Sequence, residues 1–73
     1  MNDTALKYFG ARVRLLRLKR GLSQKDLADQ AGLHRTFIGM IERAEKNVTL
    51  RNIDKLCRAL GVTISEIFDG YKR

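Results

Sequence analysis

The chain lacks residues that several classes of protein require. It has 73 residues with no proline or tryptophan, one cysteine and one histidine. A single cysteine excludes a disulfide within one chain, and with one histidine it leaves a zinc site short of ligands. No apolar run approaches the length of a membrane span and no secretory hydrophobic segment follows the N-terminus. We therefore expect a cytoplasmic protein with no metal, cofactor or membrane attachment.

Acidic residues are also scarce. Lys and Arg number 15 against 8 Asp and Glu, which gives a formal net charge of +7. The excess is concentrated in residues 12–51, where ten bases stand against four acids. A concentrated positive zone favours a polyanionic partner, either nucleic acid or an anionic membrane. Charge alone does not distinguish between the two.

Glycine and hydroxyl residues divide the chain into five predicted helices in one all-α domain, residues 1–73. Apolar residues recur at helical spacing between the punctuating residues. Ser23, Thr49 and Thr63 are predicted caps, and Thr63 with Glu66 forms a full capping box. The helices are expected over roughly 4–20, 24–31, 34–43, 50–60 and 64–68. In the fourth, the residues expected to face inward are Leu50, Ile53, Leu56, Cys57 and Leu60. Cys57 is interpreted as a small buried hydrophobe.

The second and third helices are joined by a short segment, "QAGLH", with glycine at its centre. A tight turn of this kind sets two helices at a steep crossing in a helix-turn-helix. Ala28 falls where the two axes approach, and Gly32 supplies the left-handed residue. Counted from Gln24, alanine is fifth and glycine ninth, and apolar residues fill places four, eight, ten, fifteen and eighteen. We therefore predict a helix-turn-helix over about 24–43.

The chain resembles the phage lambda repressor/Cro-like helix-turn-helix family over roughly residues 9–68. The resemblance rests on "RVRLLRLKRGLSQKDLADQAG", "IER" and "LCRALGVTISEIF". Within the family, "GLHRTFIGMIERAEKNVTL" is most similar to the controller proteins of bacterial restriction-modification systems. Those are small dimeric regulators that bind operators ahead of their own and the endonuclease genes. The resemblance implies a lambda-repressor-like fold and a bacterial or phage, nucleoid-associated regulator. Its partner would be operator DNA, with RNA polymerase a candidate second partner.

The resemblance makes the third helix the recognition helix, which lies against bases and phosphates in the major groove. Arg35, in its first turn, is suited to bond guanine O6 and N7. Thr36 can bond a base edge or a phosphate, and Met40 offers an adaptable apolar contact. Gly39 would let the helix approach the DNA closely. Phe37 either packs on the core edge or touches a thymine methyl or sugar.

Residues at the ends of the second, third and fourth helices are candidates for phosphate contacts, which fix register without reading sequence. The candidates are Gln24, Arg43, Lys46, Asn47, Thr49 and Arg51. For Arg51, a solvated surface position is an equally open alternative. By family resemblance, Glu42 pairs with Arg17, so Arg17 is not counted in the DNA-binding charge.

Residues about 60–70 are the predicted dimerisation region. Four apolar residues there are candidates for an interface: Val62, Ile64, Ile67 and Phe68. A 73-residue domain buries only about 60% of its unfolded surface, so a second copy would add stability. The alternative is that Ile67 and Phe68 close the core of one protomer, with only Ile64 shared between two.

Two residues depart from the family pattern. His34 occupies the cap position of the third helix, where Ser, Thr or Asp is usual. We expect histidine to cap poorly, at a loss of about 1 kcal/mol at most. His34 either faces DNA or is a tolerated surface residue. Ala44 follows "IER" where glycine is common, and a left-handed conformation there would be slightly unfavourable.

Functions in other classes fit less well. An antitoxin-like subunit that binds a protein partner would normally carry a longer tail than the five residues after Phe68. A basic amphipathic first helix on a membrane would have to give up Val13 and Leu16 from the core. No pair of carboxylates or nucleophile with a base suggests an enzyme. A sequence-specific, homodimeric regulator of transcription on a palindromic operator is the leading hypothesis.

Overall fold

The computed structural model describes residues 3–72, with side chains from residue 4 onward, and this range contains five helices and no strand. The helices are α1 (Asp3–Lys19), α2 (Gln24–Ala31), α3 (Arg35–Glu42), α4 (Leu50–Leu60) and α5 (Ile64–Ile67). The predicted all-α class and the order of helices are confirmed. Across residues 3–72, no helix has the length and apolar character needed to span a membrane.

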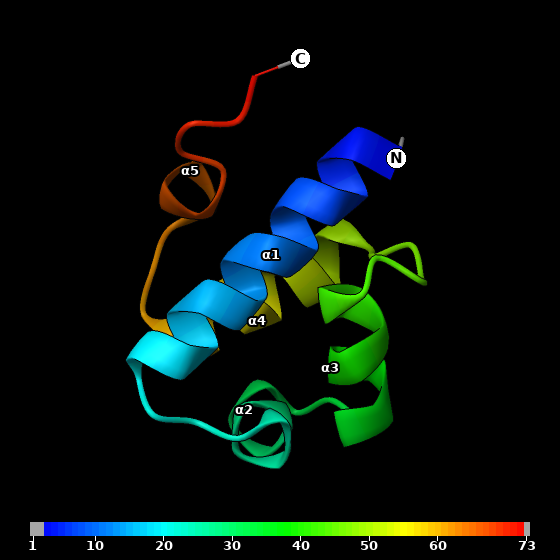
Figure 1. The fold of residues 1–73 in the computed structure, drawn as a ribbon. Helices are drawn as coiled ribbons and strands as arrows, with labels where there is room; N and C mark the ends of the chain where they lie inside the picture. Colours follow the sequence, from blue (N-terminus) through cyan, green and yellow to red (C-terminus); the bar gives the residue numbers. More distant parts are fainter. Residues whose placement is uncertain (1–2, 73) are drawn as a thin grey trace.

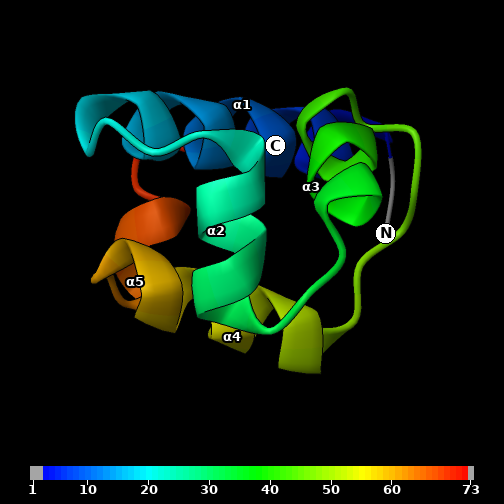
Figure 2. The same cartoon turned by 90° about the horizontal axis from the view of Figure 1, so that it is seen from below.

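The helices surround one core. In Figure 1, α1 crosses the front of the molecule with α4 behind it, while α2 and α3 lie below. Figure 1 looks along α2 and sees α3 from the side, and Figure 2 reverses this, so the two axes cross steeply as in a helix-turn-helix. In both views α5 and α3 lie on opposite sides of the molecule.

Local sequence explains where the short helices begin and end. At α2, the Ser23 hydroxyl accepts from the Asp26 amide at 2.9 Å, and the Asp26 carboxylate accepts from the Ser23 amide at 3.0 Å. These backbone and side-chain hydrogen bonds with Ser23 lower the pKa of Asp26. Thr63 and Glu66 form the same reciprocal box at α5. Gly32 ends α2 at φ 68°, a left-handed conformation that suits a residue without Cβ.

The core draws residues from every helix, including Cys57, whose pKa is raised by burial. Its members are Phe9, Val13, Leu27, Ala28, Ala31, Ile38, Ile41, Ile53, Leu56, Cys57, Leu60 and Ile67. Helix α1 can approach α3 closely because it carries Gly10 there. A Cβ on Gly10 would lie 2.3 Å from the Ile41 carbonyl oxygen, which is too short for any side chain.

The prediction that Leu50 faces inward is wrong. Its side chain is 70% exposed, whereas Ile53, Leu56, Cys57 and Leu60 are buried. Leu50 is the first residue of α4, one turn before the first buried position. Helical periodicity assigns it near the inner face, but no other helix covers this end of α4 sufficiently to bury it.

Candidate nucleic-acid interface

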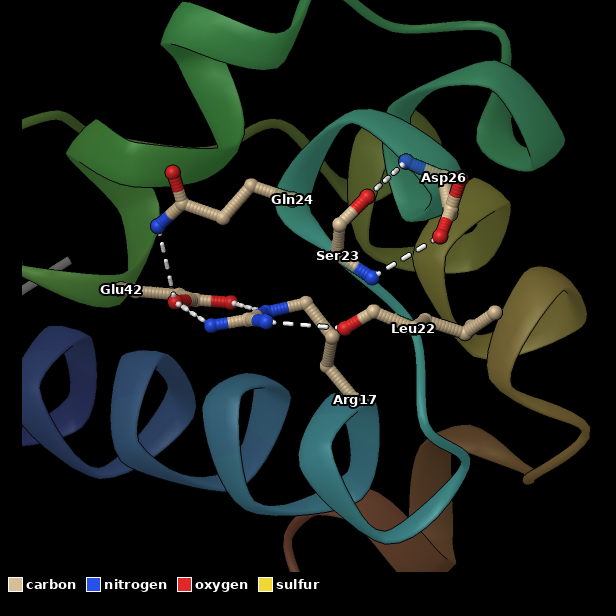
Figure 3. A network of polar contacts seen from close by, with 6 residues as sticks. All are labelled: Arg17, Leu22, Ser23, Gln24, Asp26 and Glu42. Atoms are coloured by element: carbon tan, nitrogen blue, oxygen red, sulfur yellow. Dashed lines mark hydrogen bonds and ion pairs between the residues drawn. The ribbon is translucent and has the colours of Figure 1, made fainter.

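A buried polar network joins α1, α2 and α3 (Figure 3). Arg17 donates from Nε to Glu42 Oε2 at 2.7 Å and from Nη2 to Glu42 Oε1 at 3.0 Å. The Arg17 and Glu42 side chains are only 10% and 4% exposed. The hydrogen bond to Glu42 raises the pKa of Arg17, against the opposing effect of burial. The ion pair implied by the family resemblance is therefore present in the structure.

Two further bonds extend this network. Arg17 Nη1 donates to the Leu22 carbonyl at 2.9 Å, and Gln24 Nε2 donates to Glu42 Oε1 at 3.2 Å. The network thus links the end of α1 and the start of α2 to the end of α3. It restrains the angle between α3 and α2, because each connection is a directional hydrogen bond in which a buried charged side chain takes part.

The outer surface of α3 presents a short set of polar and apolar side chains. Arg35 and Thr36 are exposed, and Met40 is half-buried. The one carboxylate in α3 belongs to Glu42, and it is buried in the ion pair with Arg17. This surface therefore offers hydrogen-bond donors and a thioether with no exposed negative charge, which suits a polyanion.

Two residues of α3, Phe37 and Gly39, lie closer to the core than the outer surface. Phe37 is half-buried and packs against the core cluster. Gly39 is buried beside the side chains of Arg43 and Gln24, and a close approach of α3 to DNA at this residue stays a prediction. A Cβ there would lie 3.1 Å from Arg43 Nη1 and 3.5 Å from Gln24 Oε1. Gly39 makes room for two of the predicted phosphate-contact side chains.

His34 is the N-cap residue of α3, and the expected weakness of a histidine cap stays a prediction. Its Nδ1 accepts from the Thr36 amide at 3.2 Å, with the His34 backbone extended at φ −79° and ψ 140°. An imidazole nitrogen here replaces the usual side-chain oxygen. Because Nδ1 is the acceptor, a neutral ring carries its proton on Nε2 and is a donor at that atom.

The loop after α3 carries several of the phosphate candidates. Ala44 is left-handed at φ 57°, the conformation that glycine would adopt more easily. Arg43 pairs with Glu45 at 3.0 Å, with the two side chains 58% and 51% exposed. Lys46 and Asn47 are exposed.

The start of α4 adds the remaining candidates. The Thr49 hydroxyl accepts from the Asn52 amide at 3.1 Å and can still donate its own proton to an acceptor. Arg51 is exposed. Gln24, by contrast, is half-buried and already donates to Glu42, which leaves one amide proton for a phosphate.

The predicted interface residues separate into two groups. Ile67 is fully buried and Phe68 stacks on Phe9 with ring centroids 5.6 Å apart. Assigning Ile67 to a dimer surface is therefore wrong, because this turn of α5 closes the protomer's own core. Val62 is half-buried against the core, and Ile64 is 39% exposed. Ile64 is the clearest surface residue of the four.

Sequence reasoning missed the roles of Gln24 and Arg12. The Gln24 bond to Glu42 spans 18 residues, and Arg12 binds carbonyl groups 54 and 55 residues away. No local pattern signals such distant pairs. Within residues 3–72, no group of three or more His, Cys, Asp or Glu side chains could hold a metal ion.

Comparison with known proteins gives a family and a relative of similar length. A family model described as helix-turn-helix matches residues 13–67. Control protein C.BamHI of Bacillus amyloliquefaciens is 48% identical over 70 residues, which cover 94% of this chain and 86% of the relative.

Two solved structures have the same fold. The restriction-modification controller protein C.AhdI from Aeromonas hydrophila has a TM-score of 0.84 at 47% identity, covering 88% of this chain and 97% of that one. The controller protein C.Esp1396I was solved as a tetramer with its natural 35-base-pair operator. It has a TM-score of 0.82 at 31% identity, over 88% of this chain and 84% of that one.

Proposed function

Because this chain belongs to the helix-turn-helix family, we propose that it is a regulator of transcription that binds double-stranded operator DNA sequence-specifically as a homodimer. The single observation that carries the proposal is the outer surface of α3. It presents Arg35, Thr36 and Met40 while its one carboxylate is buried in an ion pair. A helix with this surface suits the edges of bases in the major groove.

The target genes are those of a restriction-modification system. This inference is supported by C.BamHI and C.AhdI, which are named as control proteins of that class. A regulator bound at a promoter would lie beside RNA polymerase, its candidate protein partner, and would act in the cytoplasm on the nucleoid. It would act by binding alone, without a catalytic step or a cofactor.

Selection of bound duplexes from a random DNA pool tests the proposal directly. A symmetric dimer should enrich a palindromic sequence with half-sites about one helical turn, roughly 34 Å, apart. At least one guanine is expected in each half-site, opposite Arg35. Failure to enrich any sequence would contradict specific recognition, and a single unrepeated half-site would contradict a symmetric dimer.

Arg35→Ala should reduce discrimination at one guanine per half-site by about 1–3 kcal/mol, since it removes a bidentate pair. The measurement is a gel shift with the selected operator and with the same duplex altered at that guanine. Lys46→Ala is the matched control, because it removes one exposed charge that is assigned to phosphate. It should weaken both duplexes alike. An equal loss on both duplexes for Arg35→Ala would show that Arg35 does not read a base.

Ile64→Asp should give a folded monomer. The side chain is 39% exposed in one protomer, so a carboxylate there is tolerated alone but not inside an apolar interface. Operator affinity should fall by about a hundredfold or more, because the two half-sites would no longer be bound by one linked unit. Sedimentation equilibrium measures the loss of the dimer, and circular dichroism checks that the chain stays folded. A gel shift measures the loss of operator affinity.

Leu18→Asp provides the comparison for Ile64→Asp. Leu18 is 54% exposed on α1, and with Leu15 at 44% it marks the alternative surface for a dimer. The variant should remain dimeric. If Leu18→Asp were the monomer and Ile64→Asp stayed dimeric, the interface would lie on α1.

A further inference from the structure

Helix α5 is too short to hold its own position. It has four residues, and a single turn does not compensate for the entropy of forming it. The Thr63–Glu66 capping box orders its first turn, and Ile67 anchors it in the core. Backbone contacts at the last turn of α5 therefore add to what orients its exposed apolar residue, Ile64.

The side chain of Arg12 reaches that end from α1. Its Nε donates to the Ile67 carbonyl at 3.0 Å and its Nη2 donates to the Glu66 carbonyl at 3.1 Å. Ile67 and Glu66 are the last two residues of α5. Carbonyl groups at the end of a helix attract cations, and hydrogen bonds from a charged donor are stronger than neutral ones.

The side chain of Arg12 lies across a hollow between the two helices. Arg12 lines this hollow together with Leu16, Val62, Ser65, Glu66 and Asp69. The helices are not in flush apolar contact at that point. There the planar guanidinium group bridges them by donating to both carbonyls. The stacking of Phe68 on Phe9 and the hydrogen bond from the Tyr8 hydroxyl to the Asp69 carbonyl hold the chain just after α5.

We propose that Arg12 is a positioning residue for dimerisation: it holds α5 so that Ile64 meets a second copy of the chain. The inference rests on the homodimer of the proposed function. A surface that is ordered before association binds more tightly than one that must be ordered on binding. Arg12 thus acts on operator affinity through the dimer and not through the positive charge it adds.

Arg12→Met tests the proposal, because methionine keeps an unbranched apolar stem and removes both donors. The dissociation constant of the dimer should rise by about tenfold or more in sedimentation equilibrium. Arg14→Met is the matched control, with the same loss of charge at an exposed position two residues away on α1. It should dimerise as the wild type does. An Arg12→Met chain that also dimerises like the wild type would overturn the proposal.

A linked dimer separates positioning from simple damage to the fold. Two copies are joined by about 30 Gly and Ser residues, whose mean span is roughly 30 Å. Linkage makes association intramolecular, so linked Arg12→Met should bind the selected operator within about twofold of the linked wild type. If the linked variant stayed as weak as the unlinked one, Arg12 would not be acting through dimerisation.

Local order at α5 gives a readout that survives if Arg12→Met fails to fold. Arg12→Lys keeps the charge but has one ammonium group in place of a planar fork. Hydrogen exchange should accelerate at the amides of Phe68 and Asp69, which bond to carbonyls within α5, and stay unchanged in α2. Unchanged exchange at both amides would overturn the proposal. A wild-type chain that stays monomeric on the operator would contradict the proposed function itself, whatever Arg12 does.

Discussion

Glu42→Ala is expected to lower the free energy of unfolding by about 3–5 kcal/mol, the effect of removing one partner from a buried ion pair. Arg17 would keep a charge in a site where its side chain is 10% exposed, and Gln24 would lose its acceptor. A domain of 73 residues has a total stability of roughly 4–11 kcal/mol. The substitution therefore removes a large share of it, and urea denaturation followed by circular dichroism measures the loss.

Glu45→Ala is the matched control for this effect. It removes a carboxylate that also pairs with an arginine, but both Glu45 and Arg43 are more than half exposed. Exposed pairs contribute about 0–1 kcal/mol. Equal losses for Glu42→Ala and Glu45→Ala would mean that water reaches Arg17 freely once Glu42 is gone.

A double variant checks the cause. Arg17→Met combined with Glu42→Ala leaves no unpaired charge in the site, so it should be more stable than Glu42→Ala alone. If the double variant were less stable, the loss would come from packing around the two side chains and not from a stranded guanidinium group.

Operator affinity should fall by roughly a thousandfold between 50 and 200 mM salt. Arg43, Lys46 and Arg51 give three cationic phosphate candidates in each protomer, hence about six in a dimer. Six neutralised phosphates give a slope of about −5 in a plot of log affinity against log salt. Gel shifts or fluorescence anisotropy over this range measure the slope, and a flat response would contradict the phosphate contacts.

Single substitutions show how much each cationic residue contributes to the salt dependence of binding. Arg51→Ala should reduce its magnitude by about 2, because a homodimer loses two contacts at once. Arg58→Ala is the control, since Arg58 lies at the other end of α4, where it pairs with Asp54 with its side chain 80% exposed. It should leave the slope nearly unchanged. An unchanged slope for Arg51→Ala would support the alternative that Arg51 is only a solvated residue.

The sequence alone determined the helices and their order. Caps such as Ser23 and Thr63 act on amides three residues away, and Gly32 and Gly61 end helices through their own backbone conformation. These are local effects, so a local pattern predicts them. The same holds for the choice of α3 as the candidate recognition helix, because the spacing of Ala28 and Gly32 and the apolar places is itself local.

Which side chains of these helices are buried or exposed was harder to predict from the sequence. Arg35 and Thr36 are exposed where helical periodicity placed them, since Ile38 and Ile41 fix which side of α3 is buried. Whether Phe37 packs on the core could not be read from the same periodicity, because it lies at the edge of the buried face. The burial of Gly39 beside Arg43 and Gln24 was not predicted, because a glycine's position in the sequence does not show which distant side chains fill the space next to it.

The tertiary structure decided what depends on distant residues meeting. Leu50 is exposed because the end of α4 is uncovered, while Phe68 is held by stacking on Phe9, 59 positions earlier in the chain. Arg12 adds a formal positive charge to the sequence, yet its guanidinium is committed to the end of α5. Periodicity and capping describe neighbours within one or two turns of a helix. The packing of one helix on another is set by the whole core, and only the folded chain shows which side chains that packing leaves exposed to a partner.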